Sequence, residues 1–432
     1  MPPIGETGPE VVLATVGSLG DLHPYIAIAL GLKERGYVPI IATSELHRAR
    51  IERLGLAFHP MRPHLLEFER DPEVFKRFMD PRFGTEIILR ELFIPSVRES
   101  YEDLLKVVAG AELLLTHSVV FAGPLIAEKV GVPWLSAVVQ PLAILSKHEG
   151  FVPPQLPAFR HVLPLWPLVQ GPIVREGRRR LLKWFGPIAD FRRELGLGPG
   201  PHPMFEGTYA PDGLLVLFSE VFAREQPDWP EQAIVTGFPF FDDAFAEGAP
   251  ADVARFLDAG EPPIVFTLGS SAVFDAGDFY QESLSAARLL GRRALLLIGT
   301  DERNRLEGLG PDAFAAPYAP HSSVFPRAAV NVHQGGVGTT AQALRAGRPM
   351  LVVPWSHDQF DNAERVKRLG VGGVLYRRRY KAQHVARALR RLLEDETVAR
   401  RAHGVGERVR GEDGVKAACD AIEARINKGR RV

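Results

Sequence analysis

Apolar and polar positions near the start of the chain follow a repeating order. Residues 11–16 form a continuous apolar run, VVLATV, which is followed by the loop GSLGDLHP, a helical stretch YIAIALGLKERG and a second apolar run, VPIIAT. Continuous apolar runs of this length are typical of strands that are buried on both faces of a parallel sheet. We therefore predict a βαβ unit with a right-handed crossover, whose helix begins near Pro24 and ends at Gly36.

The same order recurs between residues 330 and 366. A strand ending VNVH leads into a turn with three glycines, a helical run AQALRA closed by Gly347, a second strand MLVVP and a polar loop at 356–362. Glycines allow backbone N–H groups to approach an anion, and a helix start adds positive partial charge. The pattern predicts an anion site, with an ordinary tight strand-to-helix turn as the alternative.

A proline-rich, extended stretch at residues 221–243 separates the two series of strands and helices. A chain of 432 residues also exceeds one ordinary core. We predict two Rossmann-like, doubly wound parallel-sheet α/β domains that face a cleft, over residues 1–230 and 231–408. A helix in 409–432 is expected to pack back toward the first domain. Further helices are predicted at 86–109, with a kink at Pro95, and at 279–290, 381–394 and 415–427.

Composition excludes several classes of protein. Lys plus Arg and Asp plus Glu both number 52, so the net charge of zero argues against binding nucleic acid by bulk electrostatics. One cysteine, Cys419, excludes an internal disulfide and a cysteine-ligated zinc site. The start of the chain has no secretory signal pattern, and no uncharged apolar stretch of about 18 residues is present. We therefore expect a cytoplasmic protein with no transmembrane segment.

Residues 178–195 combine apolar positions at helical spacing with a basic rim. Three interpretations remain open at this point. The segment is a surface helix that covers the core, a wall of an apolar binding pocket, or a peripheral contact with an anionic membrane surface.

Five stretches together resemble a known family. HQGGVGTTAQALRAGRPMLVVPWSHDQFDNAERV resembles the nucleotide-sugar signature of family 1 glycosyltransferases, which have the two-Rossmann-domain GT-B fold. The other matching stretches are VGSLGDLHPYIAIALGLKERGY, THSVVFAGPLIAEKVGVPW, TGFPFFDD and VFTLGSSAV, and they point to the bacterial and sterol-glucosyltransferase-like branch. The resemblance covers nearly the whole chain and says nothing specific about the acceptor.

The resemblance implies an inverting, metal-independent UDP-glycosyltransferase, a hexosyltransferase of natural-product glycosylation. Such an enzyme moves a sugar, here glucose, from a UDP-sugar to a hydroxyl of a lipophilic phenolic, sterol or polyketide-like acceptor, and needs no cofactor. Residues 62–95 and 141–205 are rich in Phe, Leu, Pro and Trp, which suits an apolar acceptor pocket as well as ordinary core. A dTDP-sugar donor is the alternative to UDP.

The resemblance also assigns the donor site. Tyr318 stands where the family stacks an aromatic ring on the base, and Ala319 would contact the base edge. Asp358 and Gln359 would bind sugar hydroxyls. Plant members carry a ribose-binding glutamate where this chain has Ala341, so the ribose contact is open. The remaining donor-site residues, which surround the diphosphate or orient its loops, are Gly20, Gly269, Ser270, Ser271, His333, Gly335, Gly336, Gly338, Thr339 and Asn362.

Two residues are candidates for the proton chemistry. Plant members place a catalytic histidine where this chain has Asp21, and a partner aspartate where it has His117, so the pair is swapped. We predict Asp21 as the general base that takes the acceptor proton, with His117 as its partner or as a second candidate. His23 is an alternative base, and Asp21 could instead only cap the helix predicted to begin at Pro24.

Other functions on the same fold remain as alternatives. A nucleotide-sugar epimerase is disfavoured by the Asp358–Gln359 loop, and a lipid-linked glycosyltransferase is compatible with the pattern. A nucleotide-binding auxiliary protein without turnover is a non-enzymatic alternative, which a usable base at Asp21 disfavours.

Overall fold

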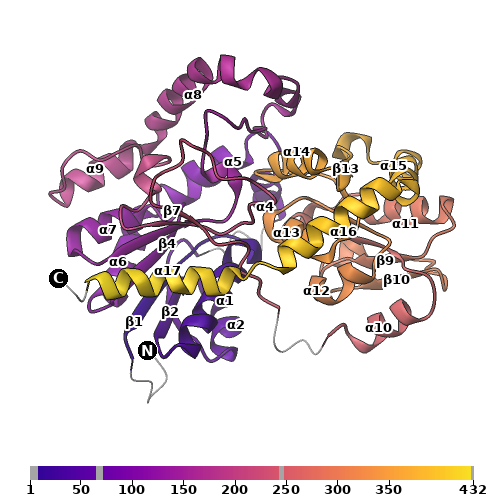
Figure 1. The fold of residues 1–432 in the computed structure, drawn as a ribbon, viewed down its shortest axis with the longest axis horizontal. Helices are drawn as coiled ribbons and strands as arrows, with labels where there is room; N and C mark the ends of the chain where they lie inside the picture. Colours follow the sequence, from indigo (N-terminus) through magenta and orange to yellow (C-terminus); the bar gives the residue numbers. More distant parts are fainter. Residues whose placement is uncertain (1–7, 65–71, 243–247, 430–432) are drawn as a thin grey trace.

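The computed structural model describes residues 8–64, 72–242 and 248–429. These residues form two α/β domains that lie side by side, the first drawn in indigo to magenta and the second in orange (Figure 1). Each domain is built on one all-parallel sheet, so the fold is the predicted pair of Rossmann-like domains.

The first sheet has seven parallel strands in the order β3-β2-β1-β4-β5-β6-β7. Its strands are β1 (Glu10–Ala14), β2 (Val38–Thr43), β3 (Ala57–Pro60), β4 (Leu113–His117), β5 (Trp134–Val138), β6 (Leu214–Val216) and β7 (Ala233–Val235). The chain order reverses between β1 and β4, and ligands bind at such a switch point, beyond the carboxyl ends of the strands. Because β7 belongs to this sheet, the boundary we placed at residue 230 falls before the sheet ends.

The helices of the first domain are α1 (Leu19–Glu34), α2 (Arg48–Arg53), α4 (Pro72–Phe78), α5 (Gly84–Ile87), α6 (Val97–Val108), α7 (Ala122–Val130), α8 (Trp166–Leu182) and α9 (Gly186–Glu194). Helices α1, α6 and α7 contact strands of the sheet, whereas α8 projects away from it (Figure 1). The helix predicted at 86–109 is divided into α5, a π-helical turn at Ile88–Phe93 and α6. Pro95 has no N–H for a helical bond, which explains the break before α6.

The second sheet has six parallel strands in the order β10-β9-β8-β11-β12-β13, and it reverses between β8 and β11. Its strands are β8 (Ile264–Thr267), β9 (Ala294–Leu297), β10 (Ala313–Ala316), β11 (Val330–His333), β12 (Met350–Val352) and β13 (Gly372–Val374). Its helices are α10 (Ala251–Asp258), α11 (Phe279–Leu289), α12 (His321–Val324), α13 (Val337–Ala346), α14 (Gln359–Leu369) and α15 (Ala382–Glu394).

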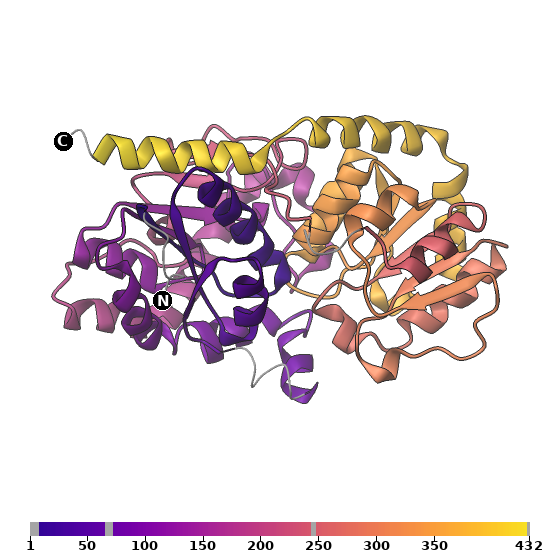
Figure 2. The same ribbon diagram turned by 90° about the horizontal axis from the view of Figure 1, so that it is seen from below.

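Two C-terminal helices connect the domains. Helix α16 (Glu396–Arg410) packs on α13 of the second domain, and α17 (Gly414–Gly429) returns along α1 of the first (Figure 2). Arg35, at the C-terminal cap of α1, forms an ion pair of 2.6 Å with Glu423 of α17. A Cβ on Gly31 would lie 2.7 Å from Val415, so glycine allows the close approach of these two helices.

Candidate active site

The N-termini of two helices, one from each domain, meet in the cleft. A Cβ on Gly338, in the first turn of α13, would lie 3.4 Å from Gly20 Cα in the first turn of α1. A Cβ on Gly20 would lie 4.0 Å from Gly338 N. Because neither residue has a side chain, the two helix starts approach each other closely. The predicted glycine loops therefore face one another across the cleft.

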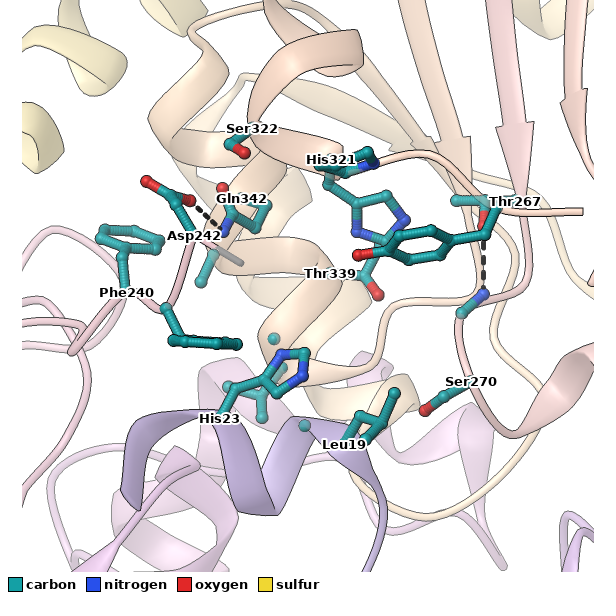
Figure 3. A pocket seen from close by; sticks show the side chains of 18 of the residues that line it. Leu19, His23, Phe240, Asp242, Thr267, Ser270, His321, Ser322, Thr339 and Gln342 are labelled. Atoms are coloured by element: carbon teal, nitrogen blue, oxygen red, sulfur yellow. Dashed lines mark hydrogen bonds between the residues drawn. The ribbon is translucent and has the colours of Figure 1, made fainter. Parts of the chain in front are cut away.

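A first cavity of about 510 Å³ lies on the second-domain side of this junction. Figure 3 shows His23 of α1 pointing into it from one side and Thr339 of α13 from the other. Predicted donor-site residues in its wall are Gly20, Gly269, Ser270, Tyr318, Ala319, Gly338 and Thr339. Tyr318 is about half exposed at the wall of this cavity.

A second cavity, of about 370 Å³, lies on the first-domain side. Its wall is mostly apolar and comes from the helical segment between β3 and β4 and from the loops after β5 and before β6. Apolar residues in this wall are Phe75, Phe78, Met79, Ile88, Leu89, Leu92, Phe93, Leu142, Leu145, Met204 and Phe205. Its polar residues include Asp21, His117, Asp358 and Gln359.

The two cavities share part of their lining. Residues that line both are Gly20, Ser270, Val337, Gly338 and Thr339. The two cavities therefore adjoin at the start of α13, where a ligand bound in one would lie next to a ligand bound in the other. The N–H groups of the first helical turn have no partner inside the helix, so they can bind an anion there.

Asp21 uses its two carboxylate oxygens differently. Oδ2 accepts the Ser18 N–H at 2.8 Å and the Ser18 hydroxyl at 3.2 Å, which closes a capping box at the start of α1. Oδ1 lies 3.6 Å from His117 Nε2. The helix thus begins at Leu19, since Ser18 caps it, and our prediction of a start near Pro24 was wrong. Asp21 does cap the helix, and it still presents an oxygen to His117.

The tautomer of His117 follows from its backbone contact. Val119 N–H donates to His117 Nδ1 at 3.3 Å, so in the neutral ring the proton is on Nε2, which faces Asp21. Burial lowers the pKa of His117, and the Asp21 charge opposes that shift only in part. A neutral His117 therefore directs its Nε2–H toward the Asp21 carboxylate at the edge of the second cavity, although the 3.6 Å separation is longer than a hydrogen bond.

His333 lies beneath the glycine turn and lines neither cavity. Its Nδ1 accepts the Gly335 N–H at 3.1 Å, and burial lowers its pKa to about 3. The neutral ring therefore carries its proton on Nε2, which has no hydrogen-bond partner among the described residues. Gly335 belongs to the predicted diphosphate site, but its N–H is already bonded to His333 and so is not available to an anion.

The loop before α14 is held rigidly. Asn362 Nδ2 donates to Asp358 Oδ2 at 2.6 Å and to the Gly335 carbonyl at 2.9 Å. Gln359 Oε1 accepts hydrogen bonds from the N–H groups of Trp355 and Ser356. Gln359 lines the second cavity, and its amide nitrogen remains to donate a hydrogen bond. Burial raises the pKa of Asp358 to about 7. The hydrogen bond from Asn362 lowers this pKa, and the negative charge of Asp21 raises it. Asn362 thus ties this loop to the glycine turn.

Other residues predicted from the sequence line only one of the two cavities. Ser271 and Gly336 line the second cavity alone, whereas Ala341 lines the first. His23 also lines the first cavity and not the second, and burial lowers its pKa to about 3, with Arg50 and two histidines adding to the shift. The alternative base therefore lies on the side away from His117.

The basic segment at 178–195 belongs to α8 and α9. Phe185, Ile188 and Phe191 are buried in the core, and no residue of the segment lines either cavity. It covers the core and does not form a pocket wall. Contact with a membrane surface stays a prediction, and no helix in the described ranges is both long and apolar enough to cross a membrane.

Several residues in the cavity walls were not identified from the sequence. Thr85 donates or accepts a hydrogen bond of 2.9 Å with His357, and this contact joins the domains beside the second cavity. Asp242 and Gln342 line the first cavity. Asp242, Gln342 and His357 lie in stretches that resemble the family, but the resemblance assigns them no role, and only the folded chain brings them to the site. Within the described ranges, no group of three His, Cys, Asp or Glu residues is arranged to hold a metal ion.

Comparisons with known proteins agree with this architecture. Residues 11–142 match the glycosyltransferase family 28 N-terminal domain, and residues 284–413 match the erythromycin biosynthesis protein CIII-like, C-terminal domain. The chain is similar in fold to the calicheamicin glycosyltransferase CalG4, with a TM-score of 0.73 at 19% identity over 97% of this chain and 98% of that one. It is also similar to the glycosyltransferase VinC in complex with dTDP, with a TM-score of 0.66 at 17% identity over 96% and 99% of the two chains.

Curated sequences give a more specific relationship. Sterol 3-beta-glucosyltransferase of Leptosphaeria maculans is 25% identical over 97% of this chain, which spans only 29% of that longer protein. O-mycaminosyltylonolide 6-deoxyallosyltransferase of Streptomyces fradiae is 31% identical over 96% of this chain and 97% of its own length. Because the similarity to the Streptomyces enzyme extends along both sequences, the chain belongs to the family 1 UDP-glycosyltransferases of the GT-B fold.

Proposed function

We propose that this enzyme transfers glucose from UDP-glucose, bound in the first cavity, to a hydroxyl of a lipophilic small molecule in the second cavity. One observation carries the proposal: the two cavities join at the start of α13, and Asp21 lies in the wall of the second. Donor and acceptor would then meet between an anion-binding helix start and a carboxylate.

The residues suit an inverting displacement. The acceptor hydroxyl would attack the anomeric carbon on the face opposite the diphosphate, while its proton passes to Asp21 Oδ1. The bond from the anomeric carbon to the diphosphate oxygen breaks, and the electron pair leaves with the diphosphate. The N–H groups at the start of α13 would stabilise that negative charge, so this proposal uses no metal ion.

The second cavity supports a lipophilic acceptor. Its walls are mainly aromatic and aliphatic, and pockets with such walls and a few convergent polar groups are typical small-molecule sites. The names of the O-mycaminosyltylonolide 6-deoxyallosyltransferase and the sterol 3-beta-glucosyltransferase support natural products or sterols as the acceptor class. The single cysteine suits a reducing compartment, and we place the reaction in the cytoplasm.

A product-detecting screen tests this proposal. Purified protein is incubated with UDP-glucose or dTDP-glucose and with phenol, sterol and macrolide aglycones, and glycosides are detected by mass spectrometry. We expect a β-glucoside from the α-linked UDP-glucose, formed equally well with EDTA present. An α-glucoside would overturn the inverting mechanism. Nucleotide binding without product from any acceptor class would favour the auxiliary-protein alternative.

A further inference from the structure

One amide in the wall of the first cavity has a fixed orientation. Gln342 Nε2 donates to Asp242 Oδ1 at 3.4 Å (Figure 3). An ionised carboxylate only accepts hydrogen bonds, so the nitrogen of the amide must be the atom that faces Asp242. Figure 3 shows Gln342 between Asp242 on one side and Ser322 on the other. Its Oε1 is buried, and it has no hydrogen-bond partner among the described residues.

Asp242 is itself held in place. Arg345, one helical turn after Gln342 on α13, forms an ion pair of 2.6 Å with Asp242 Oδ2. The Arg345 guanidinium also lies over the Phe240 ring, 4.6 Å from its centroid. Asp242 follows β7 in the segment that connects the two domains. Its hydrogen bond with Nε2 therefore sets the orientation of the Gln342 amide.

A buried acceptor without a donor costs free energy, unless a ligand supplies the donor. Gln342 lies three residues after Thr339, so both side chains are on one face of α13. With a diphosphate at the start of α13 and a base against Tyr318, the ribose of the donor would lie along this stretch of the helix. Ala341, at the position where the family pattern has its ribose contact, offers only a methyl group.

We infer that Gln342 Oε1 accepts a hydrogen bond from a ribose hydroxyl of the donor, with Asp242 and Arg345 as positioning residues. This inference rests on the proposed function, because it requires a nucleoside diphosphate in the first cavity. Its alternative is that Gln342 only ties the interdomain segment to α13 through Asp242.

Calorimetric titration of nucleotides distinguishes the two roles. UDP, 2′-deoxy-UDP and 3′-deoxy-UDP are titrated into the full-length protein, into Gln342→Leu, which keeps the bulk of the side chain, and into Gln383→Leu. Gln383 is an exposed residue of α15 that lines neither cavity, so it is a matched control. We expect Gln342→Leu to weaken UDP binding about five- to tenfold and Gln383→Leu to leave it unchanged.

The deoxy analogues identify the hydroxyl. In the unchanged protein, removal of the hydroxyl that Gln342 accepts should cost about five- to tenfold in affinity, whereas in Gln342→Leu the same removal should cost almost nothing. Equal losses in both proteins for both analogues would overturn the inference. So would unchanged UDP affinity in Gln342→Leu.

The positioning role has its own variant. Asp242→Ala frees the amide to rotate, so UDP affinity should fall by less than in Gln342→Leu, with the melting temperature of both variants recorded to exclude unfolding. If the unchanged protein binds no nucleotide at all, the proposed function fails. If it binds UDP and Gln342→Leu binds it equally well, only the assignment of Gln342 fails.

Discussion

Asp21 combines a structural and a chemical task in one side chain. Oδ2 accepts two hydrogen bonds from Ser18 and so caps α1, while Oδ1 lies 3.6 Å from His117 Nε2. A capping bond needs only an acceptor oxygen, whereas a general base needs a carboxylate. An amide at this position separates the two tasks, because asparagine keeps one acceptor oxygen for the cap.

We therefore predict that Asp21→Asn folds normally and binds UDP as the unchanged enzyme does, while kcat falls about 10²- to 10⁴-fold. The measurements are steady-state turnover, nucleotide affinity and melting temperature. Asp252→Asn, in the first turn of α10 and outside both cavities, is the matched control and should keep full turnover. Near-normal turnover in Asp21→Asn would remove Asp21 from the mechanism.

Asp358 should make stability depend on pH. Burial raises its pKa to about 7 in the folded protein, above the value of about 3.9 expected in the unfolded chain. The folded state thus favours the protonated carboxyl. The contribution of Asp358 to the free energy of unfolding is fully present below about pH 4 and is lost as the pH rises through 7. The loss amounts to up to about 4 kcal/mol, since each pKa unit corresponds to about 1.4 kcal/mol.

Asp358→Asn removes the titrating group and keeps an oxygen for Asn362. We expect the variant to gain stability relative to the unchanged, ligand-free protein as pH increases from 5 to 8. Urea unfolding followed by tryptophan fluorescence at each pH measures this difference. A difference that stays constant with pH would show that Asp358 does not titrate in this range.

At the scale of an element, the turn between β11 and α13 depends on Gly335. Its φ of +89° lies in the region that favours glycine, and a Cβ there would lie 2.6 Å from Val352 Cγ1. Gly335→Ala should therefore destabilise the protein by about 2–4 kcal/mol, through backbone strain and overpacking. Urea unfolding at constant pH measures the change.

Gly404→Ala is the matched control for Gly335→Ala. Gly404 lies inside α16, and a Cβ there would meet nothing within 4 Å. Alanine favours the helical backbone, so this variant should be more stable by about 0.5–1 kcal/mol. Equal effects of the two substitutions would contradict the conformational role of Gly335.

The elements also show what local sequence could predict. The strands beside both glycine turns were predicted because buried parallel strands are continuous apolar runs. Helix α16 was missed, since its sequence contains Gly404 and Gly406 and is strongly polar. Gly406 has a packing reason that sequence alone does not reveal: its Cβ would lie 2.6 Å from Gly347 Cα, so glycine lets α16 approach the end of α13.

For the candidate site too, local sequence predicted the motif residues but not the contacts between distant segments. Motif residues such as Asp21 and Thr339 reach the cavities because their loops follow the strand ends at the switch points of the two sheets. Asp242 could not be assigned, since its partners Gln342 and Arg345 are about one hundred residues away in the chain. Which N–H groups remain for an anion also depends on the fold, because His333 occupies that of Gly335.

At the scale of the whole molecule, two groups of contacts join the domains. Beside the second cavity Phe75 packs edge-on against Phe274 at 5.5 Å, and Thr85 bonds His357. Outside the lining of that cavity, Glu149 bonds Arg365 of α14 at 2.8 Å and Arg368 at 3.2 Å. These contacts cross the cleft, so the structure is a closed arrangement of the two domains.

Glu149→Gln tests whether the contact with α14 holds the domains closed. The variant removes the negative charge of one partner of Arg365. Arg365 remains paired with Asp361 at 2.7 Å, so the substitution leaves no buried charge without a partner. A charge-assisted hydrogen bond contributes about 1.5–3 kcal/mol, so the balance should shift about tenfold or more toward an open arrangement. Small-angle scattering should give a larger radius of gyration without ligand, and kcat/KM for the acceptor should fall.

The matched control is Glu128→Gln, because Glu128 pairs with Arg192 at 2.6 Å within the first domain. It removes an ion pair of similar geometry that does not cross the cleft, so both the radius of gyration and kcat/KM should stay unchanged. A saturating nucleotide should restore the smaller radius in Glu149→Gln, since a ligand that contacts both domains favours the closed arrangement by its difference in affinity. If Glu149→Gln behaves as Glu128→Gln does, closure depends on other contacts between the domains, such as those of Phe75 and Thr85 or the bond from the Val152 N–H to Asp361 at 3.0 Å.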